Sequence, residues 1–408
     1  MTQRKVAIIG GGAAGMMSGI FAAYSGDEVV IFEKNAKIGR KLYITGKGRC
    51  NVTNNCDIQT VLANTPTNSR FLYSALNRFS PQDTIDFFEM NGLPLKTERG
   101  NRVFPVSDKA ADVVDTLLRI SKQAGCKIIH ENVVDIIIEN SEIKAIKTNN
   151  RTMNFDKVII ACGGKSYPLT GSTGDGYKFA KKAGHSIIPL KPSLVPLQSS
   201  DRFCSELNGL QLKNIAISII DQKTDKKIYD DFGELLFTYY GMSGAVILSA
   251  SSHMREMSEG RYRVDIDLKP ALSEEQLNSR LLREFEKNNN KEYGYVLRSL
   301  LPLKMTEVFA HRSEIPMKKK CSEITKTERY NIIKLLKNFS VTISSFRPID
   351  EAIVTSGGVN TKEINPKTME SKFVKGLYFA GEVIDVDCYT GGFNLQTAFS
   401  TGVLAAEN

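Results

Sequence analysis

The chain of 408 residues is poor in the side chains that cross-link proteins or bind metals, with seven cysteines and four histidines. An odd number of cysteines scattered over a long chain does not form a disulfide framework, so we expect a reducing compartment, the cytoplasm. None of the histidines has ligand-like spacing, and Cys50 and Cys56 have no adjacent histidine or second cysteine pair. The sequence therefore predicts no metal site.

Long apolar runs are also scarce. The only one covers 6–26, is free of charged residues, and follows Arg4 and Lys5, as in a signal peptide or a membrane span. Three successive glycines, Gly10 to Gly12, would interrupt a helix in the middle of a bilayer. We therefore interpret the run as a buried strand, a glycine turn and a buried helix, and we expect a soluble protein.

The chain lacks internal repeats and low-complexity segments, and its composition, 41% hydrophobic and 24% charged, excludes wholesale disorder. Its length is typical of two or three domains. The formal net charge of +9 is compatible with an anionic partner but does not establish one.

Hydrophobic periodicity predicts the order of elements along the chain. It indicates a strand at 6–9, a helix at 13–24 and a strand at 28–32. Two helices follow at 81–90 and 110–124, then a β-meander at 127–155 and a further strand at 157–162. Near 189–196 the pattern changes to short strands, at 215–220 and 234–237. Two amphipathic helices follow at 274–287 and 326–337, then a strand at 341–345, and finally a strand at 377–381 and a closing helix at 394–407.

These patterns predict a domain built from both ends of the chain, 1–190 and 346–408. A second domain, 191–345, is inserted into it. The insertion is expected to be β-rich over 191–270, helical over 271–338 and to end in a returning strand over 339–345.

The strongest motif is Gly10-Gly11-Gly12-Ala13-Ala14-Gly15, which matches G-x-G-x-x-G between a strand and a helix. In such a turn the first glycine permits the tight bend, the second lets the backbone approach a pyrophosphate, and the third allows close helix–strand packing. Glu33, at the end of the next strand, is placed to accept hydrogen bonds from a ribose. This acid disfavours a 2′-phosphate, so the motif predicts FAD or NAD. A tight structural turn is the alternative.

A basic, glycine-containing loop follows Glu33. Its cations include Lys34, Arg40, Lys41 and Arg49, the last beside Gly48. Glycines let such a loop run close to a flat ring, and the cations can offset diphosphate or flavin charge. A solvated basic loop is the alternative.

Four blocks of sequence resemble the bacterial flavoproteins of BaiN/RdsA type (also called YhiN type), NAD(P)/FAD-dependent oxidoreductases that include an aminoacetone oxidase. The blocks are VAIIGGGAAGMMSG (6–19), KIGRKLYITGKGRCNVTN (37–54), IIACGGKSYPLTGSTGDGY (159–177) and GLYFAGEVIDVDCYTGGFNLQTAFSTG (376–402). The second is highly specific to this family, whereas the inserted region matches only in general character.

The resemblance implies non-covalently bound FAD and an α/β fold of the two-dinucleotide-binding-domain flavoprotein type. This is a Rossmann-like domain with an inserted β-barrel-like and helical region. It also implies that Gly381-Glu382 corresponds to a strand-end Gly-Asp pair, with the longer acid leaving its hydrogen-bonding role open. A helix begins after Gly391-Gly392, and its N-terminal amides suit a reduced flavin, although an ordinary helix entry is the alternative.

The expected cofactor-binding residues come from the glycine turn, the basic loop, the meander, the strand before Gly163 and the C-terminal motif. They are Gly10, Gly12, Ala13, Ala14, Gly15, Glu33, Lys34, Arg40, Lys41, Gly48, Arg49, Val134, Cys162, Gly163, Gly381, Glu382, Gly392, Phe393, Asn394 and Leu395. Cys162 lies in an apolar strand, so we expect its side chain to be structural, and the role of Cys388 near the C-terminal motif stays open.

Two residues are candidates for catalysis. Reduction of a double bond needs a proton donor, which Cys50 or Tyr167 could supply. A thiol beside cations can have a lowered pKa. The alternative for Cys50 is a small buried residue that fills space.

Positive charge concentrates in the inserted region. From Arg298 to Lys337 there are ten Lys and Arg against four Asp and Glu, including Lys318-Lys319-Lys320. Such a surface would attract a polyanion such as RNA, but a solvated face is the alternative. Neither an RNA-binding module signature nor a run of aromatic residues accompanies it.

The sequence favours an FAD-dependent oxidoreductase that transfers hydride at the flavin. With a single dinucleotide fingerprint, NAD(P)H would have to visit the flavin transiently. The first candidate reaction is NAD(P)H-driven reduction of an activated C=C bond, in uracil of ribosomal RNA or in a steroid-like enone. The alternatives are an oxygen-dependent oxidase of a small amine such as aminoacetone, and a non-enzymatic flavoprotein or RNA-binding assembly factor. We predict that the protein does not associate with a membrane, and the sequence identifies no stable protein partner.

Overall fold

The computed structural model describes residues 3–408. The chain divides into two compact units, Met1–Ser193 with Ile349–Asn408, and Leu194–Pro348. Each unit has its own hydrophobic core of fully buried side chains. Among the described residues there is no helix with the length and apolarity to cross a membrane.

The first unit is built on a parallel five-stranded sheet with the strand order β19-β10-β1-β2-β6. Four of its strands, β19, β10, β1 and β2, are apolar and almost entirely buried, as expected for a parallel sheet covered on both faces, whereas the edge strand β6 is partly exposed. In sheet order the strands are Leu377–Phe379, Lys157–Ile160, Lys5–Ile9, Glu28–Phe32 and Lys127–Ile129.

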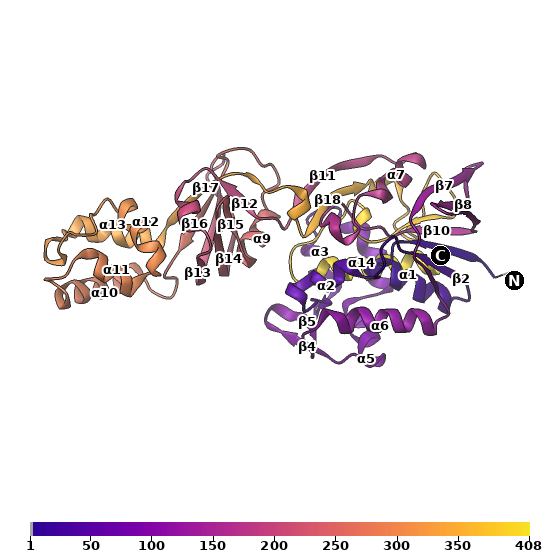
Figure 1. The fold of residues 1–408 in the computed structure, drawn as a ribbon, viewed down its shortest axis with the longest axis horizontal. Helices are drawn as coiled ribbons and strands as arrows, with labels where there is room; N and C mark the ends of the chain where they lie inside the picture. Colours follow the sequence, from indigo (N-terminus) through magenta and orange to yellow (C-terminus); the bar gives the residue numbers. More distant parts are fainter. Residues whose placement is uncertain (1–2) are drawn as a thin grey trace. The chain divides into compact units, whose positions relative to one another are not determined.

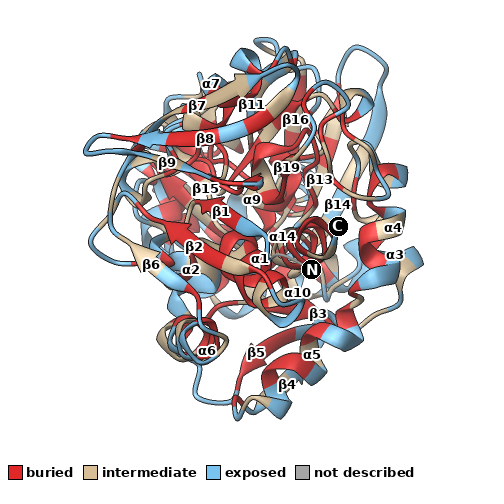
Figure 2. Cartoon of the chain, turned by 90° about the vertical axis from the view of Figure 1, so that its right-hand side faces the viewer, coloured by how far each residue is buried: buried red, intermediate tan, exposed pale blue. Residues whose placement is uncertain are grey.

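Two helices with small side chains pack closely beside this sheet. In α1 (Ala13–Tyr24) the Ser18 hydroxyl donates a hydrogen bond of 3.0 Å to the Gly402 carbonyl of α14 (Phe393–Glu407). Figure 2 shows α14 almost entirely buried. The other helices of the unit are α2 (Arg40–Ile44), α3 (Ile58–Ala63), α4 (Tyr73–Arg78), α5 (Pro81–Met90), α6 (Ala110–Gln123) and α7 (Asp175–Lys182).

Three small antiparallel sheets complete the first unit. They are β3-β5-β4 (Thr53–Asn54, Arg102–Pro105, Leu95–Glu98), β7-β8-β9 (Val133–Glu139, Glu142–Thr148, Thr152–Asn154) and β11-β18 (Ile187–Ser193, Val354–Val359). The last pair is held by the buried carboxylate of Asp387, which accepts hydrogen bonds from the hydroxyls of Ser193 (3.1 Å) and Ser356 (3.0 Å).

The predicted meander over 127–155 needs one correction. Its first run, Lys127–Ile129, is β6 and pairs in parallel with β2 in the main sheet, so the meander contains only β7, β8 and β9. The short polar break at 130–132 is long enough for the chain to leave one sheet and enter another.

The second unit contains a closed six-stranded barrel, β12-β15-β14-β13-β16-β17, with four helices, α10 to α13, gathered together beside it (Figure 1). The strands are Leu197–Ser199, Gly241–Ser243, Lys226–Thr238, Gln211–Asp221, Tyr262–Asp267 and Phe339–Phe346. The helices are α8 (Phe203–Glu206), α9 (Ala245–Ser251), α10 (Glu274–Lys287), α11 (Tyr293–Leu300), α12 (Thr306–Arg312) and α13 (Lys326–Lys337).

Local sequence fixes the ends of the two long helices. Ser273 with Gln276, and Thr325 with Glu328, form capping boxes in which side chain and backbone satisfy each other at the helix start. The predicted fold class, a Rossmann-like α/β domain with an inserted β-barrel-like and helical region, is confirmed.

Candidate cofactor and active site

The turn between β1 and α1 can be built only with glycine at two positions. Gly10 has φ +111°, and a Cβ there would lie 2.5 Å from the Ala161 carbonyl oxygen. A Cβ on Gly15 would lie 1.8 Å from the Gly10 carbonyl oxygen, so this glycine lets α1 pack against the turn. By contrast, nothing lies within 4 Å of a Cβ built on Gly12. The turn is therefore tight on the protein side and open at the helix N-terminus, where Ala13 and Ala14 form the first turn.

Glu33 follows β2 and is buried beside this turn. Its Oε2 accepts a hydrogen bond of 3.0 Å from the Gly11 amide, and Oε1 accepts from the backbone and side chain of Asn35 at 2.9 and 2.6 Å. A carboxylate offers about four acceptor positions. Glu33 is thus held in a fixed orientation with acceptor capacity left for a ribose hydroxyl.

The basic loop is attached to the glycine turn, because the Gly39 amide donates a 2.9 Å hydrogen bond to the Gly11 carbonyl. The next residues begin α2, and the Lys41 ammonium donates to Ser166 Oγ and to Glu382 Oε2, both at 2.7 Å. Arg40 is exposed and donates to the Asn35 side chain at 3.0 Å. Lys41 therefore connects the loop with the segments that follow β10 and β19.

Two other cations of the predicted set bind carboxylates. The Arg49 guanidinium pairs with Glu98 and Asp108 and lies 4.2 Å from the centre of the Phe104 ring, while the preceding Gly48 has φ +85°. Lys34 pairs with Asp175 at 2.7 Å. These contacts anchor the loop to β4, β5 and α7, which sequence alone did not indicate.

The C-terminal motif meets the same region. Gly381 has φ +74°, and a Cβ there would lie 2.8 Å from the Ala14 Cβ in the first turn of α1. Gly392 has φ +100° and lies so close to Thr53 that a Cβ would be 2.3 Å from its carbonyl oxygen. This glycine precedes α14, which starts with the buried Phe393 and the partly buried Asn394 and Leu395.

The remaining predicted cofactor contacts are Gly163, Cys162 and Val134. Gly163, with φ +72°, follows β10, and the Cys162 thiol donates to the Ile9 carbonyl at 3.3 Å. Burial raises the pKa of Cys162 to about 12, and of Cys388 to about 11. Val134 is exposed on β7, with an exposed fraction of 47%.

The two catalytic candidates occupy different segments. Cys50 has φ +60° and a fully buried side chain. The lowered pKa expected for its thiol is wrong, because burial raises this pKa to about 12, against a weaker opposing effect of a hydrogen bond with Thr45. Tyr167 has φ +51° and is partly buried, and burial raises the pKa of its hydroxyl. An isolated tyrosine in the left-handed region is uncommon, and such strain gathers at functional sites.

Sequence reasoning missed three polar groups. Ser166 donates from its hydroxyl to Glu382 Oε1 at 2.9 Å. Asn51 Oδ1, two residues before Thr53, and the Tyr177 hydroxyl on α7 are buried, and no hydrogen-bond partner for either occurs within residues 3–408. Unpaired buried polar atoms are rare in folded proteins. Asn51 and Tyr177 both lie in the blocks that carry the family resemblance, which was the available signal.

The geometry fits an FAD-like dinucleotide. The chain leaves open space at Gly12, where α1 presents its N-terminal amides, and it holds an acid, Glu33, at the end of β2. Lys41 connects the basic loop to Glu382 of the C-terminal motif. The unpaired Asn51 Oδ1 is a further group that a bound ligand can satisfy. Within the described part of the chain, no group of three or more His, Cys, Asp or Glu could hold a metal ion.

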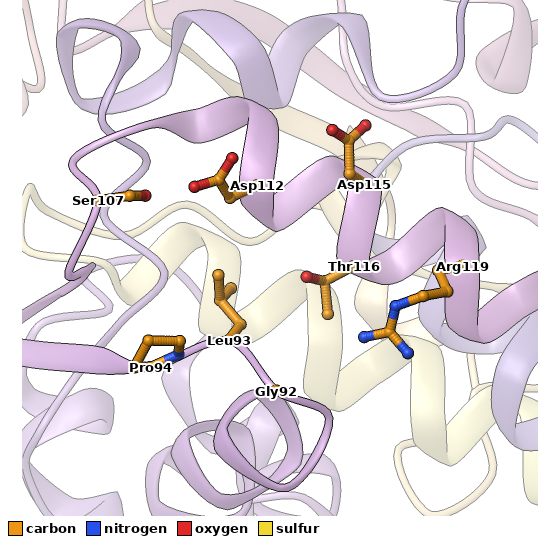
Figure 3. A pocket seen from close by; sticks show the side chains of 8 residues that line it. All are labelled: Gly92, Leu93, Pro94, Ser107, Asp112, Asp115, Thr116 and Arg119. Carbon is orange, nitrogen blue, oxygen red and sulfur yellow. The ribbon is translucent and has the colours of Figure 1, made fainter.

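A separate open hollow of about 580 Å³ lies between α6 and the α5–β4 connection (Figure 3). Its polar side chains include Asp112, Asp115 and Arg119. Arg119 already donates to the Asn91 carbonyl and to Gln123. The hollow contains none of the glycine, loop or C-terminal motif residues described above.

Comparison with known proteins agrees with this geometry. The sequence model of the HI0933-like protein Rossmann domain matches residues 4–408. The chain is 32% identical to the 3-dehydro-bile acid delta(4,6)-reductase of Clostridium scindens, over 99% of this chain and 98% of that protein.

It is also 32% identical to the ribosomal RNA dihydrouridine synthase of Haemophilus influenzae, over 98% of this chain and 96% of that protein. Among solved structures, a 3-ketosteroid-Δ4-(5α)-dehydrogenase from Rhodococcus jostii superposes with a TM-score of 0.53 at 12% identity. That alignment covers 99% of this chain and 95% of the other, which shows a shared fold.

Proposed function

The chain belongs to the HI0933-like Rossmann-domain family and is an FAD-dependent oxidoreductase, and from that premise we propose that it reduces uracil in ribosomal RNA to dihydrouracil with NAD(P)H as electron donor. Such a substrate requires a cytoplasmic protein. The proposal has two parts, the reaction and the substrate, which rest on different observations.

The reaction is supported by what the relatives' names have in common. A dihydrouridine synthase saturates a ring double bond conjugated to a carbonyl group, and a delta(4,6)-reductase acts on double bonds of a 3-oxo compound. Both are reductions of an activated C=C bond. FAD, when bound, supplies the hydride for such a reduction. This chain supplies the cradle formed by the glycine turn, Glu33 and Lys41, together with Tyr167 as a candidate proton donor.

In this proposal NAD(P)H binds transiently at the flavin and has no binding domain of its own. In the described chain the five-stranded sheet is the only parallel one, and the turn after β1 is its only G-x-G-x-x-G turn. A second dinucleotide domain is therefore lacking in the part of the chain that the structure describes.

The substrate is supported by the charge of the second unit, which is the single observation that favours RNA over a steroid. Four of the ten cations between Arg298 and Lys337 are partly buried and contact protein groups: Arg312 lies over Phe339, Lys319 pairs with Glu328, Lys337 with Asp267, and Arg329 donates to Asn278. Of the remaining cations, Lys304 donates a hydrogen bond to the Asn208 carbonyl. The other six are exposed, and within residues 3–408 none of them forms an ion pair. We call them the basic set: Arg298, Lys304, Lys318, Lys320, Lys326 and Lys334.

One exposed aromatic side chain, Tyr330, lies beside the basic set, although the sequence shows no aromatic run. Tyr330 is 49% exposed on α13, between Lys326 and Lys334, and the Lys334 ammonium lies 4.8 Å from the centre of its ring. Residues four apart on a helix share one face. Exposed tyrosines beside cations offer stacking surfaces for unpaired bases as well as charge for phosphates.

The decisive measurement is the dihydrouridine content of ribosomal RNA from cells with and without the protein. We expect dihydrouridine to be lost on deletion and restored by the wild-type chain. A variant with Lys318, Lys320, Lys326 and Lys334 changed to Gln should restore much less. The matched control changes four exposed lysines of the first unit, Lys122, Lys147, Lys181 and Lys367, to Gln and should restore fully.

Anaerobic mixing separates the competing reactions. We expect the visible band of the oxidised flavin to bleach with NADH or NADPH. Bleaching by aminoacetone alone would overturn the reductase in favour of an amine oxidase. Unchanged ribosomal RNA together with turnover of a steroid-like enone would keep the reaction but reject RNA as substrate.

A further inference from the structure

We propose that Glu382 is a positioning residue that holds the Lys41 ammonium at the N-terminal end of α1 for the diphosphate of the cofactor, and does not contact the cofactor itself. The inference rests on the FAD-binding part of the proposed function and is independent of the substrate. It differs from what the strand-end position of Glu382 suggests, which is a direct contact with the cofactor.

Three hydrogen bonds from the protein fix the orientation of the Glu382 carboxylate and occupy three of its roughly four acceptor positions. Oε2 accepts from the Lys41 ammonium at 2.7 Å, while Oε1 accepts from the Ser166 hydroxyl and the Thr355 amide, both at 2.9 Å. The backbone of Gly164 packs against Oε1, since a Cβ on Gly164 would lie only 2.8 Å from this oxygen. The longer side chain of glutamate lets the carboxylate reach Lys41 and β18 together, away from the turn at Gly381.

Lys41 is connected to the glycine turn through two neighbouring segments. Its helix starts after Gly39, whose amide is bonded to Gly11. Glu382 directly follows Gly381, and Gly381 packs against Ala14 in the first turn of α1 so closely that a Cβ on it would lie 2.8 Å from the Ala14 Cβ. An ammonium group has three donors, and two of them are bound to Glu382 and Ser166. We infer that the third donor is directed to an anion bound at the N-terminus of α1, a place that favours negative charge.

The charges explain why the two residues must act together. Burial works against ionisation of Glu382, but Lys41, with the hydrogen bonds from Thr355 and Ser166, outweighs it and lowers the pKa of this carboxyl group. Glu382 is therefore a carboxylate close to the proposed position of an anionic diphosphate. Lys41 lies between the two negative groups and neutralises the first while binding the second.

A double-mutant cycle on FAD binding tests this arrangement. Apoprotein is titrated with FAD, and the dissociation constant is measured for the wild type, Glu382→Gln, Lys41→Met and the double variant. The amide of Gln keeps the shape of Glu382 but loses the charge-assisted hydrogen bond, which is about twice as strong as a neutral one. We expect the Kd to rise about 10-fold for Glu382→Gln and about 10- to 100-fold for Lys41→Met.

The double variant carries the decision. If Glu382 acts through Lys41, adding Glu382→Gln to Lys41→Met changes the Kd by less than about twofold or tightens binding. A further loss of about twofold or more would show that Glu382 contacts the cofactor and would overturn the inference. An unchanged or lower Kd for Glu382→Gln alone would overturn it as well.

Two controls exclude a general effect on folding. Glu142→Gln breaks a glutamate–lysine pair in β8, far along the chain from the glycine turn, and should leave the Kd unchanged. If Glu382→Gln does not fold, as judged by the thermal midpoint of the apoprotein, Ser166→Ala replaces it, since Ser166 contacts both members of the pair. If the wild type binds no FAD, the proposed function and this inference fail together. If it binds FAD and the cycle is additive, only this inference fails.

Discussion

The ammonium group of Lys157 lies 4.4 Å from the centre of the Tyr378 ring, and the side chain of Lys157 is only 2% exposed. Its hydrogen bond is donated to the Ala406 carbonyl near the end of α14, at 2.7 Å. One carbonyl and one aromatic face replace water poorly around a cation. Burial, with a further contribution from Arg4, therefore lowers the pKa of Lys157 to about 7.

This buried amine predicts a pH-dependent stability. The folded pKa is about 7 and that of an exposed lysine is 10.5, so the unfolded chain binds more protons between these values. Burying the protonated amine lowers the free energy of unfolding most at pH 7 and below. This cost decreases as the pH rises from about 7 to about 10.5, so the protein becomes more stable over that range. We expect the free energy of unfolding of the wild type, relative to Lys157→Met, to rise by about 1 kcal/mol per pH unit between pH 7 and 9. Urea unfolding at several pH values measures it, and parallel profiles of the two proteins would contradict it.

The glycine turn predicts opposite outcomes for two similar substitutions. Gly12→Ala meets no atom within 4 Å and keeps an extended backbone, so stability should change by about 1 kcal/mol or less. The added methyl group would project into the space assigned to the pyrophosphate, and FAD affinity should fall about 10-fold or more. Gly15→Ala would collide with the Gly10 carbonyl and should lower the stability of the apoprotein by several kcal/mol.

Thermal unfolding of the apoprotein and FAD titration separate these effects. If Gly12→Ala destabilised the apoprotein as much as Gly15→Ala, Gly12 would be required for folding, and the assignment of the space beside it to the cofactor would be contradicted.

Burial distinguishes the two candidate proton donors. The Cys50 thiol is fully buried with a pKa of about 12, so Cys50→Ala should cost about 1 kcal/mol of stability through a small cavity and leave turnover within about twofold. Tyr167→Phe should lower turnover about 100-fold with FAD affinity unchanged, because loss of a general acid typically has that magnitude. Loss of turnover in Cys50→Ala, with FAD binding intact, would assign the proton donor to the thiol instead.

Local patterns were sufficient for the N-terminal unit. The helix predicted over 13–24 and the strand over 28–32 coincide with α1 and β2, because apolar periodicity and the glycine turn both act over a few residues. In the barrel, strands were underestimated. β13 and β14 extend over Gln211–Asp221 and Lys226–Thr238, and irregularities in their register interrupt the alternation on which a sequence prediction depends.

The site shows where sequence reasoning ends. Lys41 and Glu382 are 341 residues apart, and only the folded chain brings them to 2.7 Å. The basic loop and the family resemblance predict Arg49 as a cofactor contact, and in the folded protein its guanidinium pairs with Glu98 and Asp108. A sequence shows which residues carry charge, but the pairing of those charges depends on the tertiary fold.

The antiparallel pair β11–β18 gives the protein a modular construction. The chain leaves the first unit after Ser193 and returns at Ile349, and Ser193 lies opposite Val354 in the register of the pair. The second unit thus occupies the place of a hairpin turn, with Asp387 bracing both sides of the opening. Surface turns accept long insertions at small entropic cost. We therefore expect the β11–β18 pair to close within the first unit whatever segment fills the turn between its strands.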